Sequence, residues 1–280
     1  MRVRSRAFVK HLWQKFLGLT FGPLLVSEPG RWTRAQLAAL RPSVPVPAVR
    51  SAVVAHVYYI DLFPEILRCR DVLPGAVPLH VTVPWDRVAA VQALAAPHLD
   101  VHIHPCENRG RDIAPFMSLL NAGIFDGYDA VLKLHTKRSP HLRDGDVRRK
   151  LLFAMLCGER NAACRVLAEF ARPETGLVGW ASAYRTAPEY WMANELRVSE
   201  LTRRMNADEA IRLGFFEGSM FWFRPAALER LRRLDLKTED FEDEAQQLDG
   251  TLHHAIERCF TIAAWADGFV VRDLKGRILP

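Results

Sequence analysis

The feature that most constrains this fold is an alternation of short, continuously apolar segments with segments of helical character. Strands with one face in water alternate apolar and polar residues, whereas strands covered on both faces are apolar throughout. We therefore predict a mainly parallel sheet with helices on both faces, which is an α/β fold. The five predicted strands are Ala52–Tyr58, Val77–Val83, Asp100–His104, Ala130–His135 and Gly176–Trp180.

Helical segments fill most of the chain between these strands. Asp61 and Pro64 are typical of a first helical turn, and the further predicted helices are Asp86–Ala96, Asp112–Ala122, Val147–Cys157 and Arg160–Phe170. The later half is less regular. It contains the mixed segment Tyr184–Arg204, the aromatic strand Phe215–Phe223 and the helix Pro225–Leu234. An acidic loop, Lys237–Glu244, and a final helix, Leu252–Thr261, follow.

Two parts of unequal length are predicted, an N-terminal helical extension over residues 1–49 and one α/β domain over residues 50–280. The Pro-rich segment Arg41–Val49 connects them. The extension begins with the basic segment Met1–Lys15 and continues with the apolar segment Phe16–Val26, which loosely resembles a signal peptide but has no small-residue cleavage site. An accessory helix fits better. It either contacts a membrane surface or packs on the domain, and the sequence favours neither alternative.

The chain of 280 residues carries a formal net charge of +6. Such a surface is either simply solvated or attracts an anionic partner, such as a phosphate-bearing substrate, an anionic lipid or a nucleic acid. Nucleic acid is the weakest of these, because the basic residues are spread along the chain and no recognition motif is present. No run of eighteen apolar residues occurs, so we expect no membrane-spanning helix.

The five cysteines are scattered, and no pair has the C-x-x-C spacing of a zinc site. An odd number of cysteines without a regular framework indicates reduced thiols. This favours a cytoplasmic location, because disulfides persist mainly in oxidising compartments.

Parallel sheets covered by helices bind ligands beyond the carboxyl ends of their strands, so residues at those ends are the first site candidates. Asn108, Arg109, Arg111 and Asp112 follow the third predicted strand, and Gly110 permits a tight turn there. The forked guanidinium groups and the N–H groups of the next helix favour a phosphate or a nucleotide. In the alternative interpretation, Asp112 caps the helix and the arginines are solvated or paired with carboxylates.

Lys133, His135 and Lys137 lie at the end of the fourth predicted strand, and the two-residue period places the first two on one face. A lysine inside an apolar strand is costly unless it meets an anion. The cluster therefore predicts a cradle for a diphosphate. Alternatively, Lys133 reaches a buried carboxylate such as Asp112 or Asp129, and both contacts can coexist.

Phe216, Glu217 and Gly218 lie in the aromatic strand. A carboxylate beside aromatic rings suits a sugar, and a glycine within a strand indicates close approach of a ligand or of backbone. We take Glu217 as a candidate catalytic carboxylate, and Phe216 and Gly218 as candidates for sugar or acceptor binding. The competing interpretation is an ordinary amphipathic strand with Glu217 exposed.

Asp249 stands where a helix N-cap belongs, and His253 follows one turn later on the same predicted face. Asp249 is either a capping residue alone or a general base with His253 beside it. A helix N-terminus lowers the pKa of a carboxyl group, which would keep Asp249 ionised but make it a weaker base. His56, at the end of the first strand, is a further candidate, although a lone strand histidine is more often a hydrogen-bonded core residue.

In their order along the chain, these segments resemble the rhamnan synthesis protein F family, which occurs in bacterial polysaccharide biosynthesis. The resemblance covers roughly residues 50–275 and rests on five motifs together, Val53–Tyr58, Asn108–Phe116, Lys133–Lys137, Phe216–Pro225 and Asp249–Arg258.

The resemblance implies a GT-A-like glycosyltransferase that moves a sugar, rhamnose in the namesake, from a nucleotide diphosphate donor to a bacterial surface glycan such as O-antigen, free or lipid-linked. It implies an inverting reaction in which Asp249 takes the proton of the acceptor hydroxyl. His56 and the segments Asn108–Asp112 and Lys133–Lys137 would contact the donor. The enzyme would be cytoplasmic, or peripheral on the inner face of the plasma membrane.

One position departs from the GT-A pattern. Such enzymes commonly hold a divalent metal with an Asp-x-Asp motif, and here Lys133-Leu134-His135 stands in its place. Protonated lysine cannot bind a metal, and histidine favours softer ions than Mg²⁺. We therefore expect no metal and no other cofactor, with cationic side chains stabilising the leaving diphosphate. The basic loops and aromatic residues fit equally well a non-catalytic glycan- or nucleotide-binding module that assists a partner transferase.

Overall fold

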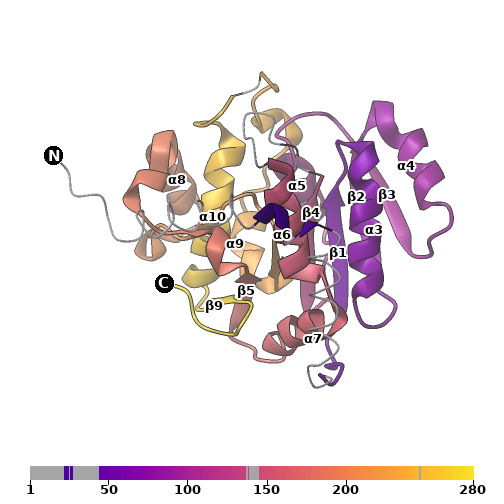
Figure 1. The fold of residues 1–280 in the computed structure, drawn as a ribbon. Helices are drawn as coiled ribbons and strands as arrows, with labels where there is room; N and C mark the ends of the chain where they lie inside the picture. Colours follow the sequence, from indigo (N-terminus) through magenta and orange to yellow (C-terminus); the bar gives the residue numbers. More distant parts are fainter. Residues whose placement is uncertain (1–21, 25, 28–43, 137, 139–144, 246) are drawn as a thin grey trace.

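In the computed structural model, the described residues are 22–24, 26–27, 44–136, 138, 145–245 and 247–280. Lys137 lies outside them, as does most of the predicted N-terminal extension. The remaining chain forms one body built around a central sheet (Figure 1).

The central sheet has seven strands in the order β3-β2-β1-β4-β8-β5-β9 (Figure 1). Neighbouring strands are parallel except at β8, which runs antiparallel to both β4 and β5. The predicted α/β fold with a mainly parallel sheet is therefore confirmed. The strands are β1 Ser51–His56, β2 Leu79–Pro84, β3 Val101–Cys106, β4 Ala130–His135, β5 Thr175–Gly179, β8 Phe221–Phe223 and β9 Val270–Asp273.

A second, two-stranded sheet pairs β6 (Tyr184–Arg185) with β7 (Phe215–Phe216). The α-helices are α3 Phe63–Val72, α4 Val88–Ala95, α5 Ile113–Asn121, α6 Gly145–Cys157, α7 Arg160–Glu169, α8 Glu195–Arg204, α9 Glu229–Arg232 and α10 Leu252–Ala266. Short 3₁₀ segments lie at Ile60–Leu62, Trp85–Arg87, Ala181–Ala183, Pro188–Asn194, Asp208–Ala210, Pro225–Leu228 and Thr238–Asp240. Among the described residues, we find no helix that is long and apolar enough to cross a membrane.

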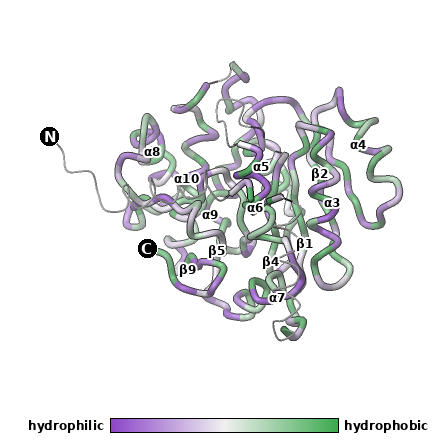
Figure 2. Tube along the Cα trace, in the orientation of Figure 1, coloured by the Kyte–Doolittle hydropathy of each residue, from purple (hydrophilic) through white to green (hydrophobic). Residues whose placement is uncertain are grey.

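Successive residues of the central strands β1, β4, β8 and β5 enter two different cores, as the continuous apolar pattern predicts. In β1, Ala52 and Val54 pack with α5, α8, α9 and α10, whereas Val53 and Ala55 pack with α3, α4, α6 and α7. The strands near the middle of the sheet are mostly coloured as hydrophobic in Figure 2. The middle of the sheet is therefore covered on both faces.

The aromatic segment Phe215–Phe223 differs from the prediction of one strand. It divides into β7 and β8, which belong to different sheets. The turn between them has left-handed backbone at Gly218 (φ 91°) and at Ser219 (φ 54°), which breaks strand geometry. This turn lies at the end of β4 that holds the predicted site.

Three further predictions need correction. The N-cap of α10 is Thr251, not Asp249, which lies two residues earlier in a bend. Pro225–Leu234 is a 3₁₀ turn followed by the single α-helical turn α9. The strand β9 was not predicted, because its four residues include two charged ones and carry little apolar signal.

Candidate functional site

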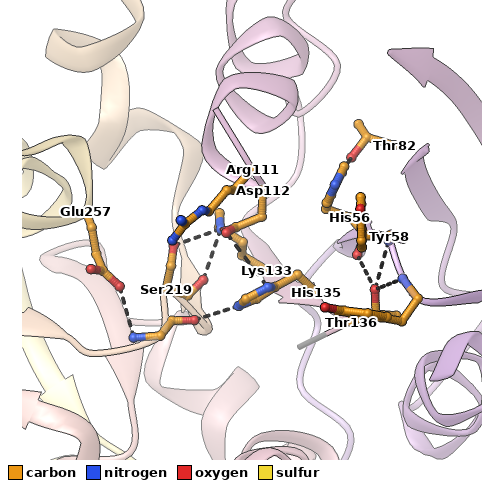
Figure 3. Close-up of polar contacts among 12 residues, drawn as sticks. His56, Tyr58, Thr82, Arg111, Asp112, Lys133, His135, Thr136, Ser219 and Glu257 are labelled. Atoms are coloured by element: carbon orange, nitrogen blue, oxygen red, sulfur yellow. Dashed lines mark hydrogen bonds and ion pairs between the residues drawn. The ribbon is translucent and has the colours of Figure 1, made fainter. Parts of the chain in front are cut away.

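The strand order of the sheet reverses between β1 and β4, because the chain adds β2 and β3 on one side of β1 and then returns to its other side. Ligands of parallel sheets bind at the carboxyl ends of strands at such a point. Thr136, just after β4, ties the two strand ends together. Its hydroxyl accepts the N–H groups of Tyr58 (2.8 Å) and Tyr59 (2.9 Å), and its own N–H donates to the carbonyl of His56 (2.9 Å) (Figure 3).

A buried ion pair lies beside this point. Lys133 of β4 is 2% exposed, and its Nζ donates to Asp112 Oδ2 (2.5 Å) and to the hydroxyl (2.8 Å) and carbonyl (3.0 Å) of Ser219 (Figure 3). An ammonium group has three donors, so all are used. The prediction that Lys133 reaches a buried carboxylate is confirmed for Asp112.

Asp112 does not cap α5 with its side chain, because no side-chain hydrogen bond to the helix N-terminus is present. Its carboxylate turns toward β4 instead. Burial alone would raise the pKa of Asp112, but the charges of His135 and Lys133 outweigh burial and hold that pKa well below its usual range. Asp112 is therefore ionised and neutralises the cationic strand end.

His135 lies on the same face of β4 as Lys133, as the two-residue period predicts. Its Nε2 donates to the carbonyl of Gly218 (2.8 Å), and its Nδ1 is 3.7 Å from Asp112 Oδ1 (Figure 3). A carbonyl only accepts, so Nε2 must carry a proton. The ring is thereby fixed between α5 and the β7–β8 turn.

Glu257 of α10 holds this turn from the other side, because its Oε1 accepts the N–H of Gly218 (2.9 Å) (Figure 3). Neither Glu257 nor Ser219 was singled out from the sequence as a site residue. The signal for Glu257 was its position one helical turn after His253, which faces the same side of α10. The turn, β4 and α10 are thus joined by polar contacts around one point.

His56 lies next to this cluster but is a buried, hydrogen-bonded residue. Its ring is 6% exposed, and Nδ1 is 3.0 Å from the hydroxyl of Thr82. Burial lowers the pKa of His56 to about 4, although the charge of Asp112 acts in the opposite direction. The ring is therefore neutral near pH 7.

The arginines of the loop before α5 are paired with the acidic loop before α10. Arg111 donates from Nε to Glu244 (2.9 Å) and from Nη2 to the carbonyl of Gln247 (2.6 Å), and Arg109 pairs with Asp243. Of the two alternatives for these arginines, solvation or pairing with carboxylates, the structure confirms the pairing. Asn108 is exposed on the same loop.

An open pocket of about 750 Å³ adjoins the end of β1. The guanidinium carbon of Arg87 is 3.7 Å from the ring centroid of Tyr58, and its Nη1 donates to the Tyr58 carbonyl. Neither Arg87 nor Tyr58 was predicted as a site residue, and Tyr58 was predicted only as the last residue of the first strand. The pocket is lined by Tyr58, Tyr59, Ile60, Asp61, Pro64, Arg87 and Leu94.

Phe216 and Glu217 are engaged in contacts of their own. The Phe216 ring is 2% exposed and packs against Tyr184 and Phe221, so it presents no open face for a sugar. Glu217 is half-exposed, and its carboxylate accepts from Nε of Arg185 (2.8 Å). Of the three residues predicted here, Gly218 is the one that contacts the Lys133 cluster.

Asp249 forms a second polar centre, before α10. Its carboxylate accepts from the N–H of Ala193 (2.8 Å) and from Nδ2 of Asn194 (2.7 Å). Burial raises the pKa of Asp249, but these hydrogen bonds outweigh burial and leave the pKa below its ordinary value. Asp249 is ionised, and it ties the segment before α8 to the segment before α10.

His253 lies in the first turn of α10. Burial lowers its pKa to about 4, and the charge of Arg111 acts in the same direction, whereas Asp112 opposes it. Both ring nitrogens are 3.0 Å from the hydroxyl of Thr251. Because Asp249 precedes the helix, the expected one-turn spacing between Asp249 and His253 does not apply.

Within the described part of the chain, no group of three or more His, Cys, Asp or Glu side chains could hold a metal ion. The predicted loop at Asn108–Asp112 and the end of β4 do converge, through the contacts of Asp112 with Lys133 and His135.

These features define the class of protein, an α/β protein with a polar site at the switch point of a mainly parallel sheet. A model of the rhamnan synthesis protein F family matches residues 36–269. The chain belongs to this family, as the motif resemblance predicted, and the family name links it to polysaccharide synthesis.

Curated relatives extend well beyond the matched region. The uncharacterized protein WxcX, from two strains of Xanthomonas campestris pv. campestris, is 32% identical to this chain over 229 residues. The match covers 80% of this chain and 33% of each relative. This chain therefore spans about a third of the length of the curated relatives that it matches.

Proposed function

We propose that the protein is a glycosyltransferase that moves a sugar, rhamnose or a similar hexose, from a nucleotide diphosphate donor to a bacterial surface glycan. The observation that carries the proposal is the convergence of the Asn108–Asp112 loop and the end of β4 at the switch point of the sheet. Membership of a family named for rhamnan synthesis supports the same reaction class. The domain would be GT-A-like, consistent with its single mainly parallel sheet.

The donor diphosphate would lie between the loop of Arg109 and Arg111 and the end of β4 at His135; Lys137, also predicted to contact the donor, lies outside the described residues. The arginine forks are donors of the kind that stabilise a leaving diphosphate. The Nε2–H group of His135 already donates to the carbonyl of Gly218, so the cationic strand end would act through its charge. Lys133 would act through Asp112, because its own three donors are already used within the protein. The pocket beyond β1 would hold the rest of the donor, beside His56.

Asp249 would be the base in an inverting reaction, with direct attack of an acceptor hydroxyl on the anomeric carbon. Glu217 would be the alternative carboxylate, and Gly218 and His253 would shape the sugar and acceptor side, whereas the buried ring of Phe216 is left to packing. Replacing Asp249 by Asn removes the charge and keeps one of the two hydrogen-bond acceptors, because an NH₂ donor takes the place of the other carboxylate oxygen. We expect Asp249→Asn to abolish transfer and to leave donor binding largely intact; near-full turnover would exclude Asp249 as the base.

Catalysis would need no metal, because cationic side chains take the place of an Asp-x-Asp motif. The test is transfer activity of the purified chain in EDTA and after addition of Mg²⁺ or Mn²⁺. Full activity in EDTA is expected, and a strict metal requirement would contradict the proposal. The reaction would take place in the cytoplasm or on the inner face of the plasma membrane, with a free or lipid-linked glycan as acceptor.

The experiment that tests the proposal is a thermal-shift screen against nucleoside diphosphates and their sugars, with and without metal. A ligand at one hundred times its dissociation constant stabilises the folded state by about 2.7 kcal/mol. At least one nucleotide sugar should raise the melting temperature and then support transfer to an acceptor glycan. Failure of the whole panel would exclude the proposal.

A second candidate function is a non-catalytic binding module that assists a partner transferase. The observation that favours it is the state of Asp249, whose carboxylate already accepts two hydrogen bonds and has a lowered pKa. Such a carboxylate is a weak base. Nucleotide sugar binding without donor hydrolysis or transfer by the purified chain would select this alternative.

A further inference from the structure

The two arginines of the loop before α5 meet the protein's own acidic groups at the position where an anionic ligand is proposed to bind. Arg111 pairs with Glu244 and Arg109 with Asp243, although more than a hundred residues separate the partners in the sequence. We call Asp243 and Glu244 the acidic pair. Pairing of the arginines with carboxylates was one predicted alternative, but the acidic loop was not named as the source of the partners.

The contact between Arg111 and Glu244 has the geometry of phosphate recognition. Nε donates to Oε2 (2.9 Å) and Nη2 approaches Oε1 (3.3 Å), so both carboxylate oxygens face the guanidinium fork. Arginine binds phosphate with the same two parallel N–H groups. A phosphate group and the Glu244 carboxylate therefore cannot use this fork at the same time.

Arg109 has an unused donor in the described part of the chain. Its Nη2 pairs with Asp243, but the buried Nε has no hydrogen-bond partner among the described residues. An unsatisfied buried N–H costs free energy. A ligand oxygen beside Arg109 would satisfy Nε, which the acidic pair does not.

The chain around the acidic pair is anchored on both sides. Phe241 is buried against Gly110, and the carboxylate of Glu242 accepts the N–H of Leu252 at the start of α10 (2.9 Å). After the pair, Asp249 is fixed to Ala193. The side chains of Asp243 and Glu244 are 88% and 29% exposed. They can therefore leave the arginines while the flanking anchors stay in place.

We propose that the acidic pair is a built-in competitor for a diphosphate at Arg109 and Arg111, so that diphosphate binding displaces Glu244 and Asp243 from the arginines. That the diphosphate belongs to a sugar donor rests on the proposed function. Competition keeps the arginine loop neutralised when no ligand is present and weakens binding of anions that cannot replace both carboxylates. Exposed ion pairs are weak, so the exchange is energetically accessible.

The test is isothermal titration with inorganic pyrophosphate at low and moderate salt, on the wild-type chain, Glu244→Gln and Asp243→Asn. Glutamine keeps the shape and a neutral acceptor but releases the charge of Arg111. Each variant should bind pyrophosphate up to about fivefold more tightly than wild type, because an exposed pair is worth at most about 1 kcal/mol. The pyrophosphate affinity of each variant should also fall more steeply as the salt concentration rises, because salt screens the attraction between pyrophosphate and the arginine that has lost its carboxylate partner.

The matched control is Glu239→Gln, which removes the same charge from an exposed residue of the same loop that is paired with neither arginine. It should bind pyrophosphate as wild type does. The proposal is overturned if Glu244→Gln and Asp243→Asn bind pyrophosphate no more tightly than wild type does. It is also overturned if Glu239→Gln gains as much pyrophosphate affinity as these two variants. Melting curves identify a variant that has lost its fold.

This experiment separates the inference from the proposed function. If no nucleotide sugar binds but pyrophosphate binds more tightly to Glu244→Gln, the competition stands and the donor assignment fails. If nucleotide sugars bind and Glu244→Gln binds pyrophosphate no better, the donor assignment stands and the competition fails.

Discussion

Two charged regions of the site are built in opposite ways. Lys133 and Asp112 are buried, and every donor of the ammonium group is used inside the protein. Arg111 and Glu244 lie at the surface, 38% and 29% exposed, and form a pair that solvent screens. The buried pair fixes the backbone around the strand end, whereas the surface pair is exchangeable. We infer that the first region positions the site and the second receives the anion.

The largest expected effect is at the buried pair. Lys133→Met removes the cation and leaves the buried Asp112 carboxylate without its main partner, so we expect a loss of about 3–5 kcal/mol of unfolding free energy. Lys237→Met is the matched control, because Lys237 pairs with Asp235 at the surface and should cost at most about 1 kcal/mol. Denaturant unfolding measures both. Similar losses of unfolding free energy in the two variants would show that the buried pair is no more important for stability than a surface pair.

The next effect depends on pH. The pKa of His56 is about 4 in the folded state and 6.5 ordinarily, so the unfolded chain binds more protons between these values. Stability therefore falls as the pH is lowered from 6.5 to about 4, on the order of 3 kcal/mol for this residue. His56→Gln should flatten that part of the pH–stability curve. An unchanged slope would show that His56 is not a buried neutral ring.

A smaller effect is expected at the turn. Glu257→Ala leaves the N–H of Gly218 without its acceptor, which should cost about 1–3 kcal/mol. The turn also holds His135, so donor affinity should fall as well. The exposed Glu200 of α8 provides a control, and Glu200→Ala should change neither quantity measurably. Unaltered stability and donor affinity in Glu257→Ala would argue against a positioning role.

The smallest expected effect is the stability cost of Glu244→Gln, at most about 1 kcal/mol. Thermal and denaturant unfolding measure it. A loss above about 2 kcal/mol would mean that the surface pair is structural, and the contrast with Lys133 would then fail.

The sequence predicted most of the sheet because buried parallel strands are continuously apolar. The range Ala130–His135 agrees with β4 at both ends, and the order of strands and helices through β5 is correct. Phe215–Phe223 was misread because its break depends on positive φ angles at Gly218 and Ser219, which periodicity does not report. The candidate site at the end of β4 was recognised because Lys133 stands in an apolar strand, where a lysine needs an anionic partner.

The partners of these residues were harder to predict. Asp112 was named as a partner of Lys133, but Ser219 and Glu257 reach the cluster through the β7–β8 turn and α10, far along the chain. The pairing of Arg111 with Glu244 spans 133 residues and leaves no local pattern. Tertiary contacts of this kind decide which cations remain available to a ligand.

The central claim is that a nucleoside diphosphate binds at the arginine loop beside the ends of β1 and β4. Its most direct test is titration calorimetry of the nucleoside diphosphate identified by thermal shift, with wild type, Arg111→Gln and the surface control Arg277→Gln. Because hydrogen bonds between charged groups contribute about 1.5–3 kcal/mol, Arg111→Gln should bind at least tenfold more weakly and Arg277→Gln as wild type does. Equal affinity of Arg111→Gln and wild type would contradict the account.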